Sequence, residues 1–480
     1  MRSVCEISEP STWPVVPAVV PVPRKRTSPI RVVTKPQAKE VASPALGERR
    51  FWEWALASAI VLGLLISLYA VTRNGLFHPM LVVAESRHWT KLMLYPAFLW
   101  AVMGTLLLVF RTLLWLRYRP FPSATLHDAP TLTVIIPAYN EGPMVAKSID
   151  SVAAALYPPG RLEILVVDDG SKDDTWEHIQ IAAARHPELV TPIRFPRNRG
   201  KREALAVGFE RAFGEIVVTL DSDSVLEKNG LLAAAGPFHD ENVGAVAGRV
   251  GVYNRTEGLI PRMLHVRYIL SFDLLRAAES TFRTVYCCPG AITAYRVSGV
   301  RRVLNKWRNQ TFLGSKCTFG EDRALTNYIL NEGFDSVYQG SAVVQTVVPT
   351  TYSRLCKMFL RWNRSYVREE IRFMGIVWKR PLGSRLFALA DRLITNIRYP
   401  IGYLSLFLLG ALTLGNPQLL LRFLVVAGIA SFFNTIYCLR TERSMNFLYG
   451  VFYSYYSLLA LTWIFPYAFM TVRARSWLTR

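Results

Sequence analysis

Long apolar runs at both ends of the chain constrain its fold more than any other feature. Residues 51–71 are apolar except for Glu53, and residues 92–116 are apolar except for Arg111. Each run is close to the roughly 20 residues that a helix needs to cross a bilayer. Helices of a soluble core are usually shorter, so we predict two transmembrane helices within residues 51–119.

The last part of the chain carries three further apolar segments, at about residues 399–414, 419–439 and 447–472. Three spans would place the basic residues 473–480 outside the cell, whereas basic flanks favour the cytoplasm. We therefore expect an even number of spans within residues 393–480, with the last segment broken near Tyr455 or Pro466. Because two N-terminal spans return the chain to its starting side, the region between the two sets is expected to be cytoplasmic, in a multi-pass protein of the cell membrane.

Much of the formal net charge of +21 flanks the apolar runs, at residues 24–26, 49–50, 117, 119, 473 and 475. This placement indicates a lipid bilayer as partner. No nucleic-acid-binding motif accompanies the charge, so we predict no nucleic-acid partner. Residues 1–50 contain eight prolines, and we expect a disordered basic tail on the cytoplasmic side. The six cysteines lack metal-binding spacing, which favours reduced thiols.

Residues 128–348 show a different pattern, in which short runs of β-branched residues alternate with segments of helical periodicity. Strands are expected at residues 132–136, 164–167, 216–220 and 243–247, and helices at 144–155 and 201–212. This alternation predicts a mostly parallel, doubly wound α/β domain, whose ligands bind beyond the carboxyl ends of the strands. Residues 351–392 mix basic and aromatic residues and are expected to form amphipathic helices in the membrane interface.

Asp221 and Asp223 give the strongest local signal, because they stand one residue apart at the end of an apolar strand. Two such carboxylates repel each other unless they share a cation, and a divalent ion that bridges them to a diphosphate relieves this repulsion. Ligation by oxygen alone suits Mg²⁺ or Mn²⁺. A solvated turn is the alternative, which the preceding apolar strand disfavours.

Two other strand ends carry polar side chains suited to a nucleotide. Tyr139 and Glu141 follow the first strand, where a nucleotide could dock, and Asp168 and Asp169 end the second, where they could bond to a base or ribose. The carboxylates at 173–174 are better explained by the start of a helix.

Two charged turns precede predicted helices, a basic turn at Arg199–Arg202 and an acidic turn at Gly320–Arg323. Arg199–Arg202 includes Lys201 and offers the donors that a diphosphate requires, although a solvated turn explains it equally well. Within Gly320–Arg323, Asp322 is the candidate base for an attacking sugar hydroxyl, with Glu321 and Arg323 setting its electrostatics. The same four residues also fit a helix N-terminus.

Taken together, these motifs resemble the processive branch of glycosyltransferase family 2, which includes hyaluronan, chitin, chitooligosaccharide and cellulose synthases. The motifs occur in that family's order: PAYNE at 137–141, VDDGS at 167–171, RGKREAL at 199–205, DSD at 221–223, CCPGAITAYR at 287–296, GEDR at 320–323 and RW at 361–362. The resemblance covers roughly residues 95–480. It implies a GT-A-like nucleotide-sugar domain inserted between transmembrane helices.

The resemblance also implies a role for each matched residue. The implied donor site comprises Asp168 or Asp169 on the uridine, Lys201 near the nucleotide, and Asp221 and Asp223 on the diphosphate and metal. Asp322 would be the base, and Cys288, Pro289 and Gly290 would line the acceptor path. Arg361 and Trp362 would close over donor and acceptor as the end of a QxxRW motif, in which Met358 replaces the usual Gln.

Three segments are most similar to hyaluronan synthases: Arg361–Glu369, Gly320–Asn327 and Ser476–Arg480, the last with Trp477 and Thr479 of a gating motif but Leu478 in place of Gly. The predicted activity is processive, inverting polymerisation of UDP-GlcNAc and UDP-GlcA into an exported polysaccharide. A chitin or chitooligosaccharide synthase that uses UDP-GlcNAc alone is the main alternative. The RW motif and C-terminal spans argue against a non-processive, lipid-linked transferase, and the intact carboxylates argue against a catalytically dead scaffold.

Overall fold

The computed structural model describes residues 88–415, 417–442 and 444–474, together with five isolated positions between 58 and 69. The predicted tail, nearly all of the predicted span at 51–71, and Trp477 and Thr479 lie outside the described residues.

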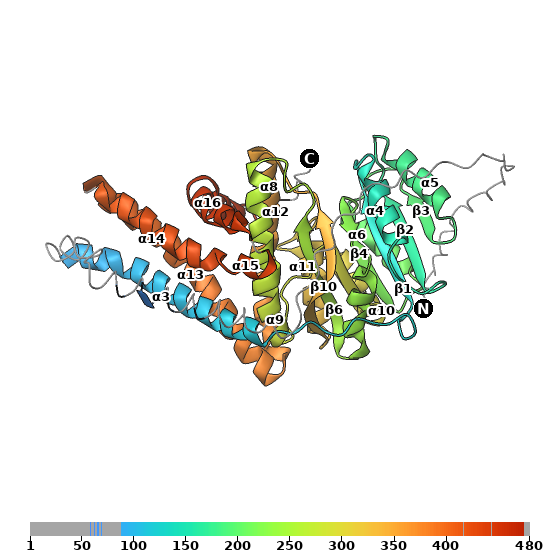
Figure 1. Cartoon of the computed structure of the whole chain (residues 1–480), viewed down its shortest axis with the longest axis horizontal. Coiled ribbons are helices and arrows are strands. Elements are labelled where there is room, and N and C mark those ends of the chain that lie inside the picture. Colours follow the sequence, from blue (N-terminus) through green and yellow to red (C-terminus); the bar gives the residue numbers. More distant parts are fainter. Residues whose placement is uncertain are drawn as a thin grey trace, which may run out of the picture. The chain divides into compact units, whose positions relative to one another are not determined.

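The α/β domain is built on an eight-stranded sheet in the order β3-β2-β1-β4-β7-β6-β10-β5 (Figure 1). Its strands are β1 Leu132–Ala138, β2 Leu162–Asp168, β3 Val190–Arg194, β4 Ile216–Leu220, β5 Ser224–Leu226, β6 Val243–Val252, β7 Ile292–Arg296 and β10 Asp335–Thr346. A separate hairpin pairs β8 Thr311–Phe312 with β9 Ser315–Lys316. All four predicted strands are present, and four further strands complete the sheet.

The sheet is mixed rather than mostly parallel. Strands β3, β2, β1 and β4 are parallel, as expected, whereas β7 runs antiparallel to both β4 and β6. The reason is the path of the chain before β7. It bridges to β10 at Thr284 and then crosses to the edge where β4 ends, so that Gly290 lies beside Asp221. Strand β7 therefore starts at that edge and runs in the opposite direction.

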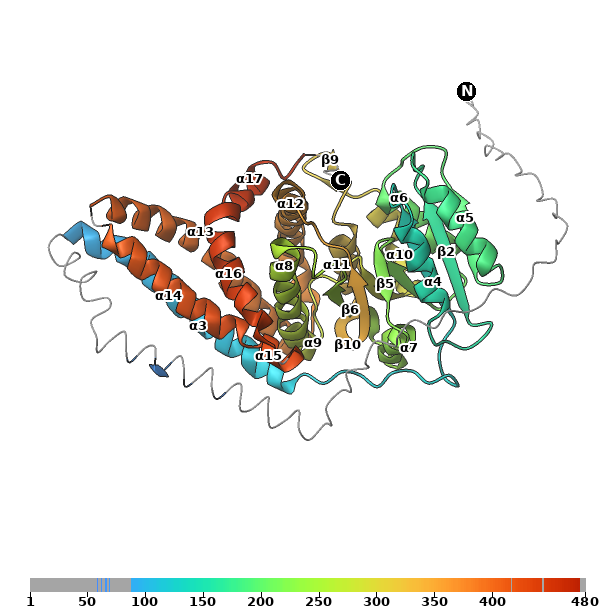
Figure 2. The same ribbon diagram turned by 45° about the horizontal axis from the view of Figure 1, so that its top comes forward.

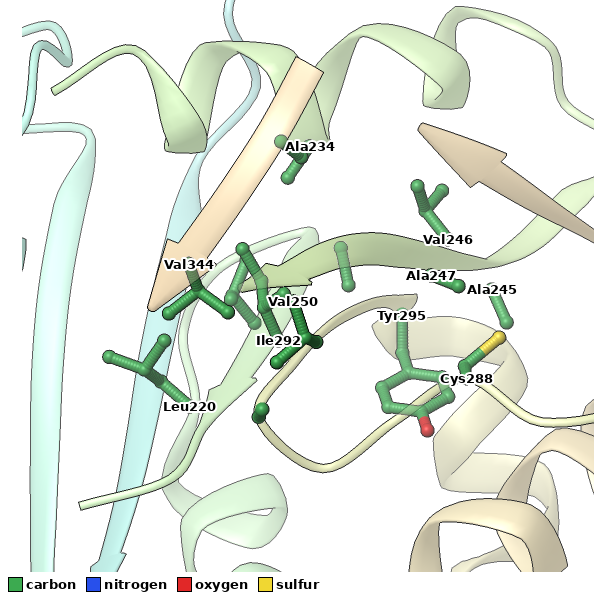
Figure 3. Packing of buried hydrophobic residues seen from close by; sticks show 14 of the residues in the cluster. Leu220, Ala234, Ala245, Val246, Ala247, Val250, Cys288, Ile292, Tyr295 and Val344 are labelled. Atoms are coloured by element: carbon green, nitrogen blue, oxygen red, sulfur yellow. The ribbon is translucent and has the colours of Figure 1, made fainter. Parts of the chain in front are cut away.

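Helices cover the sheet and form the membrane-directed part. Their bounds are α3 His88–Arg117, α4 Met144–Ala153, α5 Thr175–Arg185, α6 Lys201–Arg211, α7 Gly230–Ala235, α8 Leu259–Ile269, α9 Ala277–Thr281, α10 Val297–Arg308, α11 Glu321–Asn331, α12 Tyr352–Ile376, α13 Leu382–Gly415, α14 Gln418–Thr435, α15 Cys438–Thr441, α16 Leu448–Tyr456 and α17 Ile464–Met470. Small and branched side chains from β4, β6, β7 and β10 interlock in the core (Figure 3).

Three of the described helices are long and apolar enough to cross a membrane: Tyr95–Arg117, Leu382–Gly415 and Gln418–Thr441. A fourth span results if the pair Met445–Leu461 and Ile464–Met470, bent by 48°, counts as one. The bend lies between Tyr455 and Pro466, the two positions at which a break was expected. Helices α3, α13, α14 and α16 lie on the opposite side of α8 and α12 from the sheet (Figure 2).

Helix α12 lies between the α/β domain and the helices α3, α13, α14 and α16 (Figure 2). Arg364 and Arg368 on this helix are each 3% exposed, whereas Arg354 and Lys357 are exposed. Only some of its basic residues are thus available to lipid headgroups, because others are buried in contacts with the protein.

Candidate active site

The parallel strands β1 and β2 end at one edge of the sheet, and the loops that follow them are bonded together. The hydroxyl of Thr175 accepts hydrogen bonds from the backbone N–H groups of Glu141 and Gly142, both at 2.8 Å. Asn140 has a positive φ of 53°, and its N–H donates to Ser171 Oγ at 3.0 Å. The partly exposed side chains of Tyr139 and Glu141 therefore stand on a fixed loop at this edge.

Asp168 and Asp169 are both buried at the end of β2. The Oδ1 atom of Asp168 accepts the N–H of Ser171 at 3.0 Å. The carboxylate of Asp169 accepts the N–H groups of Arg199 and Gly200 at 2.6 and 2.8 Å. Burial raises the pKa of Asp169, and these two bonds partly offset the shift. Asp169 thus fixes the loop that leads into α6, and the structure places neither carboxylate on the open surface.

Lys201 begins α6 and lies between two carboxylates. Its Nζ atom is 2.5 Å from Asp221 Oδ1 and 3.2 Å from Glu321 Oε1. Burial alone would lower the pKa of Lys201, but Asp221 and Glu321 raise it well above its usual value. The same ion pair holds the pKa of the buried Glu321 below its usual value, against the effect of desolvation. Lys201 therefore remains a cation and links the DSD motif to the GEDR motif.

Asp223 is held from the opposite side of the motif. The hydroxyl of Thr346 on β10 donates to Asp223 Oδ1 at 3.0 Å, which orients the carboxylate. The buried Tyr268 of α8 lies near this motif. Burial raises the pKa of its phenol, and the charges of Asp223 and Asp221 raise it further. Its ring lies 6.4 Å from the ring of Trp362.

Asp322 lies in the first turn of α11. Its Oδ2 atom accepts the N–H of Gly290 at 3.3 Å and lies 3.9 Å from the sulfur of Cys287. Burial and the neighbouring Glu321 raise the pKa of Asp322, while Lys201 opposes the shift. Burial and the charge of Asp322 raise the pKa of Cys287 to about 11, so the thiol stays protonated.

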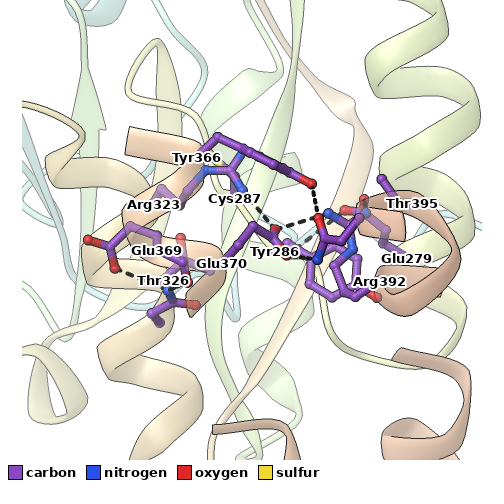
Figure 4. Close-up of polar contacts among 12 residues, drawn as sticks. Glu279, Tyr286, Cys287, Arg323, Thr326, Tyr366, Glu369, Glu370, Arg392 and Thr395 are labelled. Carbon is purple, nitrogen blue, oxygen red and sulfur yellow. Dashed lines mark hydrogen bonds and ion pairs between the residues drawn. The ribbon is translucent and has the colours of Figure 1, made fainter. Parts of the chain in front are cut away.

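The charge of Arg323 lowers the pKa of the neighbouring Asp322, and its guanidinium lies against α12. It lies 5.2 Å from the centre of the Tyr366 ring and 3.6 Å from Glu370. Glu370 also binds Arg392 of α13 at 3.1 Å, so a buried ion cluster connects the turn that carries Asp322 to that helix (Figure 4).

The segment Cys288–Gly290 separates the core from the cavity. The thiol of Cys288 is fully buried in the hydrophobic core, and Pro289 O accepts a bond from Thr293 at 2.6 Å. A Cβ atom added to Gly290 would lie 2.9 Å from Lys201 Nζ and 3.3 Å from Asp221 Oδ1. Of these three residues, Gly290 is the one that lies directly against Lys201 and Asp221.

One small cavity brings five of the predicted site residues together, whereas the other predicted residues that the structure describes do not line it. It is lined by Lys201, Asp221, Gly290, Glu321 and Asp322, with apolar contributions that include Tyr295 and Trp307. Arg361 and Trp362 belong to α12, and Trp362 is 41% exposed beside Tyr268. Met358 is 7% exposed and packs in the hydrophobic core, so the residue that replaces the expected Gln is a packing residue.

The turn before Asp322 is held by Trp307, which stands in no predicted motif, and by Arg368 of the segment Arg361–Glu369. Trp307 Nε1 donates to the carbonyl of Glu321 at 2.9 Å, and Arg368 donates to the carbonyl of Phe319 at 2.6 Å. Gly320 between them has a φ of 71°, and a Cβ atom there would lie 2.0 Å from Ser365 Oγ. Only glycine fits at this position.

The comparisons with known proteins agree with this geometry. Residues 133–304 match the model of the family described as Glycosyl transferase family 2. The chain is also 32% identical over 357 residues to an N-acetylglucosaminyltransferase of Azorhizobium caulinodans, an alignment that covers 73% of this chain and 87% of that relative. The chain belongs to glycosyltransferase family 2.

Other relatives within this family carry a different name. A hyaluronan synthase of Streptococcus pyogenes is 31% identical over 378 residues, which cover 76% of this chain and 86% of that synthase. Among solved structures, a mannosyltransferase of Pyrobaculum calidifontis in complex with GDP-Man and Mn²⁺ superposes with a TM-score of 0.57 at 21% identity, over 76% of this chain and 99% of that chain. This likeness shows a shared GT-A-like fold.

The residues at the DSD motif of this glycosyltransferase fit a divalent cation. Asp221 and Asp223 offer oxygen ligands only, on a strand end that Thr346 and Lys201 hold in place. Among the described residues, no group of three or more His, Cys, Asp or Glu side chains could hold a metal by itself. A cation bound here would therefore take its other ligands from the diphosphate of the donor and from water.

Two residues of this site, Tyr268 on α8 and Trp307 on α10, were missed from the sequence. Neither stands in a motif, and only the folded chain brings them to the carboxylates. Arg368 belongs to the segment Arg361–Glu369 that the sequence singled out, but its contact with the turn before Asp322 was not predicted.

Proposed function

We propose that this glycosyltransferase is a membrane-embedded, processive and inverting synthase that polymerises UDP-sugars on the cytoplasmic side into an exported polysaccharide. Hyaluronan, made from UDP-GlcNAc and UDP-GlcA, is the proposed product. The observation that carries the proposal is the cavity in which Lys201 and Asp221 meet Asp322. The ion cluster of Arg323, Glu370 and Arg392 links the turn that carries Asp322 to α13, a helix long and apolar enough to cross a membrane.

The donor end would bind the nucleotide sugar. Lys201 and the N-terminus of α6 are placed to contact the diphosphate, and the loops that carry Tyr139 and Asp169 lie at the same edge. A Mg²⁺ or Mn²⁺ ion held by Asp223 and Asp221 would supply positive charge to the departing diphosphate.

The acceptor end would supply the base. Asp322 accepts the proton of the acceptor hydroxyl, whose oxygen forms a bond to the anomeric carbon as the bond to UDP breaks. The segment Cys288–Gly290 would line the acceptor path, with Gly290 facing the cavity, and Arg361 and Trp362 would close over donor and acceptor. Because the attack is a single displacement, the anomeric configuration inverts, and a product with retained configuration would contradict the mechanism.

A second candidate is a chitin or chitooligosaccharide synthase that uses UDP-GlcNAc alone. Relatives named N-acetylglucosaminyltransferase, at 32% and 33% identity, favour it. Donor choice between these sugars rests on a few pocket contacts.

The test is UDP release and polymer formation by the full chain in nanodiscs with Mn²⁺ or Mg²⁺. The donors are UDP-GlcNAc alone, UDP-GlcA alone and both together, each with Asp322→Asn as the control. Sustained polymer only with both donors supports the hyaluronan type. Polymer from UDP-GlcNAc alone supports the second candidate, and no release with any donor argues against both.

A further inference from the structure

Gln310 is a buried amide that no predicted motif contains. It stands two residues after the end of α10 and is 5% exposed. Its side-chain carbonyl accepts a hydrogen bond from Arg202 Nη1 at 3.0 Å, and its Nε2 atom donates to Glu369 Oε1 at 2.8 Å. The amide therefore bridges a cation of α6 and a carboxylate of α12, and each of these partners is also buried.

The partner on α6 connects Gln310 to the residue before the base. Arg202 Nη1 also donates to the backbone carbonyl of Trp307 at 2.5 Å, and the guanidinium lies 5.1 Å from the centre of the Trp307 ring. The Nε1 atom of Trp307 in turn donates to the carbonyl of Glu321 at 2.9 Å. The backbone next to Asp322 is thus tied to Gln310 through two buried side chains.

The partner on α12 connects the same amide to the other side of the turn. Glu369 Oε1 also accepts a hydrogen bond from Arg368 Nε at 2.9 Å, and Arg368 donates to the carbonyl of Phe319 at 2.6 Å. Asn327 of α11 donates to Glu369 Oε2 at 3.1 Å. These contacts close a ring of hydrogen bonds around the turn, in which Gln310 is the link between the two arms.

Both partners of Gln310 depend on its amide. The Nε and Nη2 atoms of Arg202 are buried without a hydrogen-bond partner in the described part of the chain, so Gln310 provides one of the two hydrogen bonds of this guanidinium. An amide suits the place, because its carbonyl can face a cation while its N–H faces a carboxylate. Burial makes the loss of either bond costly, since no water replaces the missing partner.

We propose that Gln310 is a positioning residue for the base Asp322. By joining the two arms of the ring, it fixes the backbone of the turn and so the direction in which the Asp322 carboxylate points. Arg202 directly follows Lys201, which pairs with Glu321 at 3.2 Å, so the ring also sets the base relative to the donor cation. The inference rests on the proposed function, in which Asp322 accepts the proton of the acceptor hydroxyl.

The experiment is a double-mutant cycle on the full chain in nanodiscs, with Mn²⁺ or Mg²⁺ and both UDP-GlcNAc and UDP-GlcA. UDP release gives kcat for the wild type, Gln310→Leu, Asp322→Asn and the double variant. Gln310→Leu should lower kcat about 30-fold, which is less than the roughly hundred-fold cost of moving a reacting group by 1 Å. In the Asp322→Asn background the same substitution should change kcat by less than about two-fold, because a base that is already lost cannot be displaced. UDP binding, measured by calorimetry, should persist in all four.

A second variant and a matched control accompany the cycle. Gln310→Glu keeps the size of the side chain, and its ionised form can accept from Arg202 but cannot donate to Glu369. It should therefore also lower kcat only when Asp322 is present. Asn309→Leu is the matched control, since this neighbouring amide is exposed and its side chain bonds to Asn305. Its kcat should stay within about two-fold of the wild type. Melting temperatures establish that each variant is folded.

A loss that is large with Asp322 in place and absent in the Asp322→Asn background supports the positioning role. Loss by the same factor in both backgrounds overturns it, because Gln310 would then act on the fold as a whole. An unchanged kcat in both Gln310 variants overturns it as well. Turnover by Asp322→Asn above about a tenth of the wild-type value would overturn the proposed base and with it this inference, which separates that failure from a failure of Gln310 alone.

Discussion

The strand end that carries Asp221 and Asp223 and the turn that carries Asp322 contribute to one cavity, but they are held in different ways. The strand before Asp221 is fixed by the main chain, because β4 pairs with β7 along its whole length and with β1 from Ile216 to Thr219. The turn at Asp322 depends on distant side chains, among them Trp307 and Arg368, which hold the carbonyls on either side of Gly320. The donor end therefore follows a strand that the local pattern sets, although Lys201 and Thr346 orient its carboxylates, whereas the backbone of the base end itself depends on tertiary contacts.

This difference affects how each end responds to change. A substitution at the donor end should remove a ligand of the diphosphate and leave the fold intact. A substitution around the base should alter the position or pKa of Asp322 without weakening donor binding. The following predictions test that division.

The largest effect is expected for Asp322→Asn. An amide cannot accept the acceptor proton, so turnover should fall about a thousand-fold, within the range for loss of a general base. Donor binding should persist, because Lys201 and Asp221 are unchanged. UDP release gives turnover, and calorimetry with UDP gives binding. Turnover above about a tenth of the wild-type value would exclude Asp322 as the base.

A smaller loss, of about a hundred-fold in kcat/KM, is expected for Asp223→Ala, because the variant lacks an oxygen ligand for the cation at the diphosphate. Chelation of divalent ions should cause a similar loss in the wild type and little further loss in the variant. Asp174→Ala is the matched control, since Asp174 follows β2 at the same edge of the sheet but is exposed and pairs with His178 at 3.2 Å. Equal losses in both variants would show that the edge is disturbed as a whole.

Trp307→Phe should reduce kcat about ten-fold, because it removes the N–H that donates to the carbonyl of Glu321 while the ring is kept. The donor KM should stay close to the wild-type value, because Phe keeps an aromatic ring beside Arg202 and the backbone carbonyl that accepts a hydrogen bond from Arg202, next to Lys201. Trp176→Phe, in the partly buried α5, is the control. A rise in KM with an unchanged kcat would contradict a role in positioning the base.

The acidic limb of the pH profile should also report on the base. Asp322 must be ionised to accept a proton, and burial with Glu321 raises its pKa, so activity should fall with decreasing pH above the usual range of an aspartate. Lys201 opposes that shift. In Lys201→Met the limb should therefore move to higher pH, in addition to any loss of donor binding. The measurement is kcat against pH at saturating donor, and a limb unmoved in the variant would contradict the coupling.

The same difference explains what the sequence could predict. Asp221, Asp223, Asp168 and Asp169 follow apolar strands directly, so their common edge could be predicted from strand order alone. The antiparallel β7 could not, because its direction depends on how the chain crosses from β10 to the end of β4. Nor could Tyr268 or Trp307 be assigned to the site. An aromatic residue on an amphipathic helix looks the same whether it packs in a core or beside a carboxylate.

The smallest effect is expected where the chain departs from the family motif. Met358 is buried among apolar side chains, so Met358→Gln should place an amide in that core and lower the free energy of unfolding by about 1–3 kcal/mol. Turnover should stay within about two-fold of the wild type. The matched control is Met374→Gln on the same helix, which is only partly buried and should cost less stability. The melting temperature in detergent and UDP release test both parts. A large gain in turnover would contradict this expectation. It would mean that a side chain at position 358 can reach the donor or acceptor, and that this position does more than pack in the core.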